Sequence, residues 1–261
     1  MAEQFGASVW PGGLIAVPAI ERRNVRLVAE KWLVFGPVNR RGDPLINEEV
    51  AVPDELYNRE LVDLDLGDAE AIRLFSERFG RLGRPSELTD EERRHVKAAT
   101  GISGGAIRLD DFRDRAAHLL FMRGVVLAYS NRQPPRAHRD GVRLSTKQTL
   151  GWFEYLMNEG LRDFHVRVQF TTSDAEVREP LTDLYGAMCL QIANHLAEGA
   201  KFRQCGNETC QRWFVRQRSE RAQYAELRHS VGVRFCSHSC AKTQTQRDRR
   251  RRTREQRGDV R

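Results

Sequence analysis

The sequence has no hydrophobic run long enough to cross a membrane. Its most apolar early stretch, residues 14–20, is short, contains Pro18 and has no basic residue before it. A membrane helix needs about 20 apolar residues, and a signal peptide needs a basic start. We therefore expect no membrane partner and a cytoplasmic location. Thiols stay reduced there, and paired cysteines hold metal more often than they form disulfides.

Signatures of catalysis are also missing. The sequence contains no G-x-x-x-x-G-K phosphate loop and no H-E-x-x-H zinc motif. Residues 101–105 match the G-x-S-x-G pattern of hydrolases, but that pattern requires a buried strand just before it. Residues 91–99 form a charged stretch typical of a helix instead. His165 and His195 have no evident acidic or nucleophilic partner, so we do not expect an enzyme.

Lysine is scarce, with 5 residues against 38 arginines. Genome composition can enrich arginine, but it does not place charge in one segment. Residues 201–261 hold 17 Lys and Arg against 6 Asp and Glu, a net charge of +11. Residues 1–200 hold 26 against 30, a net charge of −4. This asymmetry is the electrostatic footprint of a polyanion-binding module attached to a nearly neutral body.

The apolar pattern of residues 1–200 predicts a mainly helical α+β body with few strands. Asp68 is a candidate N-cap for a helix that stops at Gly80, and Thr89 with Glu92 forms a candidate capping box. Alternation around residues 166–170 predicts a short strand. Residues 1–60 are poorly defined, with residues 25–35 suiting either a strand or a short helix. Further helices are expected over residues 110–133, 152–157 and 180–199.

Two other features of the body bear on function. Cys189 falls on the apolar stripe of the helix expected after Pro180, so we assign it to core packing. Residues 136–143, which follow Pro134 and Pro135, form a basic loop. The body would act as a sensory domain for a small-molecule effector or as a homodimerisation domain.

The remaining four cysteines form two close pairs at the C-terminal end. Four residues separate Cys205 from Cys210, and three separate Cys236 from Cys240. Zinc prefers tetrahedral thiolate coordination, and a short pair on a tight turn supplies two ligands at little loop-closure cost. So small a segment cannot stabilise itself by burial alone. We therefore predict one structural zinc ion held by all four cysteines.

Other arrangements of this segment remain open. The cysteines could form two disulfides, although the absence of a secretory signal disfavours them. His229 or His238 could replace one cysteine as a ligand. Ser237 is a candidate cap for a helix from about His238, which would place Cys236 and Cys240 at its first turn. A hairpin pair followed by a helix-start pair is the ligand arrangement of a treble-clef finger.

The expected C-terminal helix is arginine-rich and has no hydrophobic residue between residues 242 and 259. Without an apolar stripe it cannot pack on the body. It is either a solvated tail or a segment that gains order on nucleic-acid phosphates by releasing counterions. The candidate nucleic-acid contacts are Arg247, Arg249, Arg250, Arg251, Arg252 and Arg254, with Gln244 and Gln246 as candidate readers of base edges.

Residues 205–214 read CGNETCQRWF, and residues 234–240 read RFCSHSC before the arginine-rich end. This combination resembles the CGNR-type zinc finger, which closes bacterial proteins of a family of stress-induced transcription regulators. The resemblance covers residues 201–261 only, and Ala241-Lys242-Thr243 stands where the family has Gly-Asn-Arg. It implies that the four cysteines bind zinc and that the basic end binds DNA.

Together these observations predict a mainly helical body over residues 1–200 and a zinc finger with a basic helix over residues 201–261. We expect a bacterial, nucleoid-associated transcription regulator that binds double-stranded DNA. The alternative is a zinc-stabilised protein-interaction or RNA-binding module whose basic tail gives only non-specific affinity.

Overall fold

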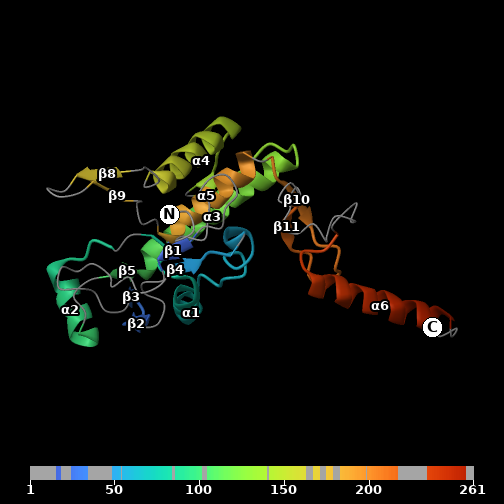
Figure 1. Cartoon of the computed structure of the whole chain (residues 1–261), viewed down its shortest axis with the longest axis horizontal. Helices are drawn as coiled ribbons and strands as arrows, with labels where there is room; N and C mark the ends of the chain where they lie inside the picture. The colour runs from blue at the N-terminus through green and yellow to red at the C-terminus, as the bar shows by residue number, and fades with distance from the viewer. Residues whose placement is uncertain are drawn as a thin grey trace.

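The computed structural model is mostly helical, with few strands (Figure 1). None of the helices it describes has the length and apolar character that crossing a bilayer requires. The description covers residues 16–18, 25–34, 49–53, 55–83, 86–101, 105–139, 141–162, 167–170, 175–178, 183–197, 199–216 and 234–256.

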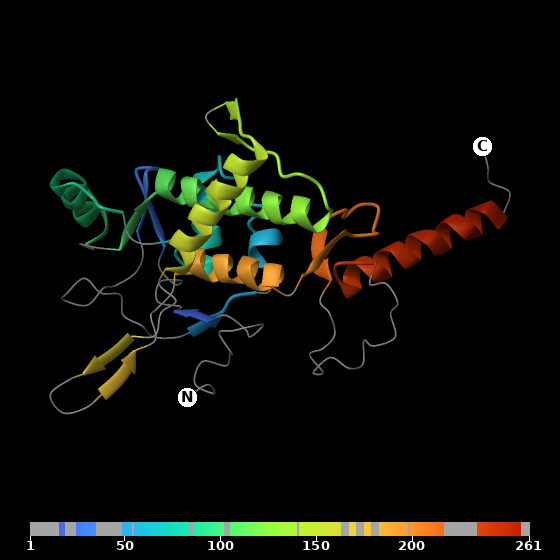
Figure 2. The same ribbon diagram turned by 90° about the horizontal axis from the view of Figure 1, so that it is seen from above.

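Three helices form the centre of the body: α3 (Leu109–Ser130), α4 (Thr146–Leu161) and α5 (Leu184–Ala197). Each contacts the other two (Figure 2). Burying apolar side chains at these contacts is the main source of stability in such a fold. The fully buried members include Phe112, Leu119, Met122, Met188 and Ile192.

Gly160 on α4 lets α4 and α5 approach closely. A Cβ atom at this position would lie 2.3 Å from the Sγ atom of Cys189, so no larger residue fits without a shift. Cys189 has no exposed surface, and burial raises the pKa of its thiol. The prediction that Cys189 is a packing residue is confirmed.

A three-stranded antiparallel sheet in the order β2-β3-β5 lies at one end of the body. It consists of β2 (Arg26–Val28), β3 (Trp32–Val34) and β5 (Ala106–Arg108), so part of the segment that suited either a strand or a helix is a hairpin. A separate antiparallel pair joins β1 (Ala16–Pro18) to β4 (Glu49–Ala51).

Two helices near this sheet carry the caps expected from sequence. Helix α1 (Ala69–Phe79) begins at Asp68, whose side chain accepts a hydrogen bond from the Glu70 N–H, and it ends at Gly80. Helix α2 (Asp90–Thr100) has the reciprocal capping box of Thr89 and Glu92. Local capping chemistry therefore located both helices correctly.

Strands β8 (Arg167–Phe170) and β9 (Ala175–Arg178) form an antiparallel hairpin, which confirms a strand near residues 166–170. Helix α5 begins at Leu184, later than the expected start near Pro180, which lies outside the described residues. Asp183 accounts for this start, because its carboxylate accepts a hydrogen bond from the Gly186 N–H.

A final antiparallel hairpin leads out of the body: β10 (Lys201–Gln204) and β11 (Trp213–Arg216). Phe202 and Val215 are buried and belong to the main hydrophobic core. Helix α6 (His238–Gln256) follows and projects away from the body (Figure 1). The hairpin therefore belongs both to the body and to the cysteine cluster at its tip.

Candidate metal centre

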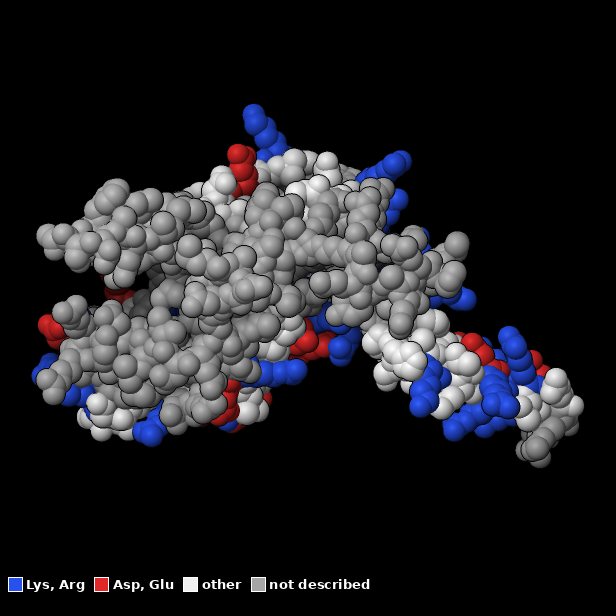
Figure 3. All heavy atoms as spheres, in the orientation of Figure 1, with Lys and Arg blue, Asp and Glu red and all other residues white. Residues whose placement is uncertain are grey.

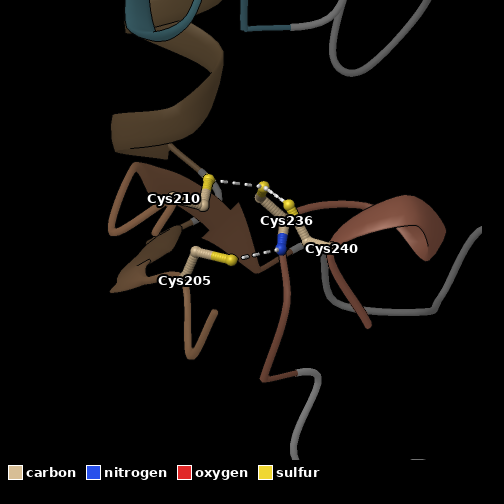
Figure 4. Close-up of side chains that lie close together, drawn as sticks. All are labelled: Cys205, Cys210, Cys236 and Cys240. Carbon is tan, nitrogen blue, oxygen red and sulfur yellow. Dashed lines mark hydrogen bonds between the residues drawn. The ribbon is translucent and has the colours of Figure 1, made fainter. Parts of the chain in front are cut away.

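The four predicted ligands lie together (Figure 4). The Sγ atoms of Cys205, Cys210, Cys236 and Cys240 are all within 4.8 Å of one another. The Sγ atom of Cys236 lies 3.6 Å from that of Cys210 and 3.6 Å from that of Cys240. A tetrahedron with zinc–sulfur bonds of about 2.3 Å has sulfur–sulfur edges of about 3.8 Å. The cluster therefore has the size to hold one metal ion.

Backbone hydrogen bonds hold the first pair in the loop between β10 and β11. The Cys205 N–H donates to the Arg212 carbonyl at 2.8 Å, and the Cys210 N–H donates to the Asn207 carbonyl at 2.9 Å. The Gly206 N–H donates to the Arg234 carbonyl at 2.6 Å. This last bond brings the segment with the second pair beside the first loop.

The second pair lies at the start of α6. The Ser237 hydroxyl accepts a hydrogen bond from the Cys240 N–H at 3.2 Å, which confirms the predicted cap. The Cys236 N–H lies 3.4 Å from the Cys205 sulfur. Donors of this kind and the positive end of a helix both stabilise thiolates. His238 is exposed and is not among the clustered ligands, and His229 lies outside the described residues.

Thiol crowding shows why the site suits a cation. Burial, together with the thiols around it, raises the pKa of Cys236, and burial raises that of Cys210. The Ser237 hydroxyl instead lowers the pKa of Cys240 to about 7. Thiols this close cannot all ionise unless positive charge is added, and a divalent cation supplies it.

Asn207 links α6 to the loop that carries Cys205 and Cys210, which we call the ligand loop, and the sequence pattern did not predict this role. Its side chain is buried, and its amide donates to the carbonyl of Cys240 at 3.2 Å. Its side-chain oxygen accepts from the Thr209 N–H at 3.1 Å and from the Arg247 guanidinium at 2.7 Å. An asparagine between two close cysteines was the available sequence signal.

Gln244 and Arg251 also contact this loop. Gln244 is buried; it accepts from the Glu208 N–H at 3.2 Å and donates to the carboxylates of Glu208 and Asp248. Arg251 pairs with Glu208 at 3.1 Å. Of the eight predicted nucleic-acid contacts, Gln244, Arg247 and Arg251 therefore hold α6 against the loop that carries the first cysteine pair.

The other predicted contacts are exposed. Successive helical residues turn by about 100°, which gathers one face away from the loop. We call it the outer face: Lys242, Gln246, Arg249, Arg250 and Arg254. All five side chains are exposed, the face has no carboxylate, and Arg252 borders it. Among the described residues these arginines form no ion pair, and Figure 3 shows basic side chains projecting from α6.

Comparison of the chain with protein-family models, with curated proteins and with solved structures finds no match in any of the three. The function therefore has to be argued from the site.

Proposed function

We propose that the chain is a DNA-binding protein in which a structural zinc ion fixes the start of an arginine-rich recognition helix. The carboxylate-free outer face of α6 carries this proposal. Zinc prefers four thiolate ligands in a tetrahedral arrangement, and a site filled by four protein ligands leaves no open position for catalysis. One pair of ligands lies in a hairpin loop and the other lies at the start of a helix, which is the ligand arrangement of a treble-clef finger.

The dimensions and chemistry of α6 suit duplex DNA. Its 19 residues span about 28 Å, and the major groove admits an α-helix. Arginines on the outer face would neutralise phosphates, while Gln246 can pair with an adenine edge. By its resemblance to the CGNR-type family, the chain would regulate transcription in the bacterial cytoplasm, with the body sensing an effector or forming a homodimer.

The test measures how full-length protein binds a duplex as salt is varied. Each neutralised phosphate adds about −0.9 to the slope of log affinity against log salt. Replacing Arg249, Arg250 and Arg254 by glutamine should therefore make the slope shallower by about 2.7. The same loss of charge on α2, by Arg93→Gln, Arg94→Gln and Lys97→Gln, should change nothing.

Two results would count against this proposal. A flat salt response of the unmodified protein would exclude nucleic-acid binding. Equal affinity for every duplex and for RNA would favour the alternative module with a non-specific tail.

A further inference from the structure

The basic loop after α3 is a projecting β-hairpin. Strands β6 (His138–Arg139) and β7 (Val142–Arg143) pair antiparallel, and the Leu144 N–H donates to the Ala137 carbonyl at 2.9 Å. Gly141 has a φ of 78°, which permits the tight turn between the strands. Figure 2 shows this hairpin projecting from the connection between α3 and α4.

Charge in the body is concentrated on this hairpin and its flanks. Residues 132–147 hold 5 Lys and Arg and 1 Asp, a net charge of +4. The other 184 residues of the body hold 21 Lys and Arg against 29 Asp and Glu, a net charge of −8. We call residues 132–147 the basic hairpin segment; it is a positive island on an otherwise acidic body.

Four basic side chains of the basic hairpin segment are free to meet a partner. Arg132, Arg136, Arg143 and Lys147 are exposed, and within the described part of the chain none of them forms an ion pair. Val142 is 64% exposed. A two-stranded hairpin with exposed side chains contributes little to stability by burial. Its charges and its apolar residue are therefore not explained by folding.

The basic hairpin segment starts beside the finger. It follows α3, and the hydroxyl of Ser130, the last residue of that helix, donates to the Ala200 carbonyl at 3.4 Å. Ala200 directly precedes β10, which carries the first ligand loop. Both views place α2, in contrast, at the opposite end of the molecule from α6 (Figures 1 and 2).

We propose that the basic hairpin segment is a second phosphate-binding surface, which contacts the same duplex that α6 binds. This inference rests on the proposed DNA-binding function. The exposed arginines and Lys147 would neutralise phosphates flanking the stretch bound by α6, and Val142 would lie against the sugar edge of a groove. The body would then position the duplex in addition to carrying the finger.

The test is the triple variant Arg136→Gln, Arg143→Gln and Lys147→Gln in the full-length protein. We expect the salt slope of duplex binding to become shallower by about 2.7, as for the matched triple variant of α6. The α2 triple variant removes the same charge at the far end and should bind as the unmodified protein does. Circular dichroism of each variant checks that the body remains folded.

Hydroxyl-radical footprinting on a long duplex separates the two surfaces. We expect the hairpin variant to lose protection of a flanking stretch and to keep the stretch protected by α6. An unchanged slope and footprint would overturn this inference and leave the α6 proposal intact. If the hairpin variant changed the salt slope and the footprint while the α6 triple variant changed neither, the result would support the hairpin surface and overturn α6 as the DNA contact.

Discussion

Glu55 is a carboxylic acid buried where the body meets the finger. It precedes the short 3-10 helix η2 (Leu56–Asn58), and its backbone is left-handed, with φ 62°. One carboxylate oxygen accepts from the Val215 N–H of β11 at 3.0 Å and from the Asn58 amide at 3.2 Å. Burial raises its pKa above the ordinary value of 4.5, despite the nearby guanidinium of Arg59.

This raised pKa predicts a pH effect on stability. The folded state holds the Glu55 proton more tightly than the unfolded state, so its contribution to stability is complete below pH 4.5 and falls as pH rises through the raised pKa. Glu55→Gln removes this fall. We therefore expect the free energy of unfolding, measured with urea, to rise for the variant relative to the unmodified protein as pH increases from 4.5 to 7.

Glu91→Gln, at an exposed position of α2, is the matched control for loss of one carboxylate away from the Glu55 site. Protonation of the metal ligands at low pH affects all three proteins alike and cancels in the differences. If the free energies of unfolding of Glu55→Gln and the unmodified protein changed in parallel with pH, that would contradict a raised pKa of Glu55 in the folded state.

At the scale of elements, α6 depends on the ligand loop. The helix has no apolar stripe, and its contacts with the loop are polar: Asn207 to Cys240 and Arg247, and Glu208 to Gln244 and Arg251. Exposed ion pairs contribute less than about 1 kcal/mol each. The buried amides of Asn207 and Gln244 are therefore the principal restraints on where α6 leaves the finger.

Asn207→Ala should weaken both the metal centre and the helix. It leaves the Cys240 carbonyl and the Arg247 guanidinium without their buried partner, and outer-shell changes of this kind lower metal affinity by about 10- to 100-fold. Competition with a chromogenic chelator measures that affinity. Thr245→Ala, at an exposed position of α6, is the matched control, and equal affinities of the two variants would exclude a supporting role for Asn207.

Elements with strong local signals could be predicted from sequence. The caps at Asp68, Thr89 and Ser237 located helix starts, since capping is a contact between near neighbours. The clustering of the two cysteine pairs could also be predicted, because metal chemistry restricts which residues act as ligands. The contact between Asn207 and Arg247 was not, because the sequence carries no signal for which distant polar groups meet. The alternation of apolar and polar residues along β10 and β11 likewise could not show that Phe202 and Val215 enter the body's core.

At the scale of the whole molecule, the finger and the body are mechanically joined. The Asn58 amide donates to the Trp213 carbonyl at 3.0 Å, and Arg212 pairs with Asp63 at 2.7 Å. The Arg123 guanidinium of α3 donates to the side-chain oxygen of Asn58 at 2.7 Å. A change in the core helices therefore has a polar route to the hairpin that carries Cys205 and Cys210 in its loop.

Removing the metal should destabilise more than the finger. We expect purified protein to contain one zinc ion and a chelator to accelerate amide hydrogen exchange across residues 202–216 and 234–256, with a smaller increase at residues 55–60. Helix α2 is the internal reference and should not change. Absence of zinc from the purified protein would contradict the proposed metal. Exchange that rises equally in all segments would contradict a metal effect centred on residues 202–216 and 234–256.

The shared hairpin also limits how such a protein can evolve. If recombination moved residues 201–261 onto another chain, Phe202 and Val215 would lose the core that covers them, and the Val215 N–H would lose the Glu55 carboxylate. A transferable unit would have to include the partners around residues 55–63 or find equivalents in its new host. Finger and body are therefore expected to be inherited together and to acquire compensating substitutions along β10 and β11.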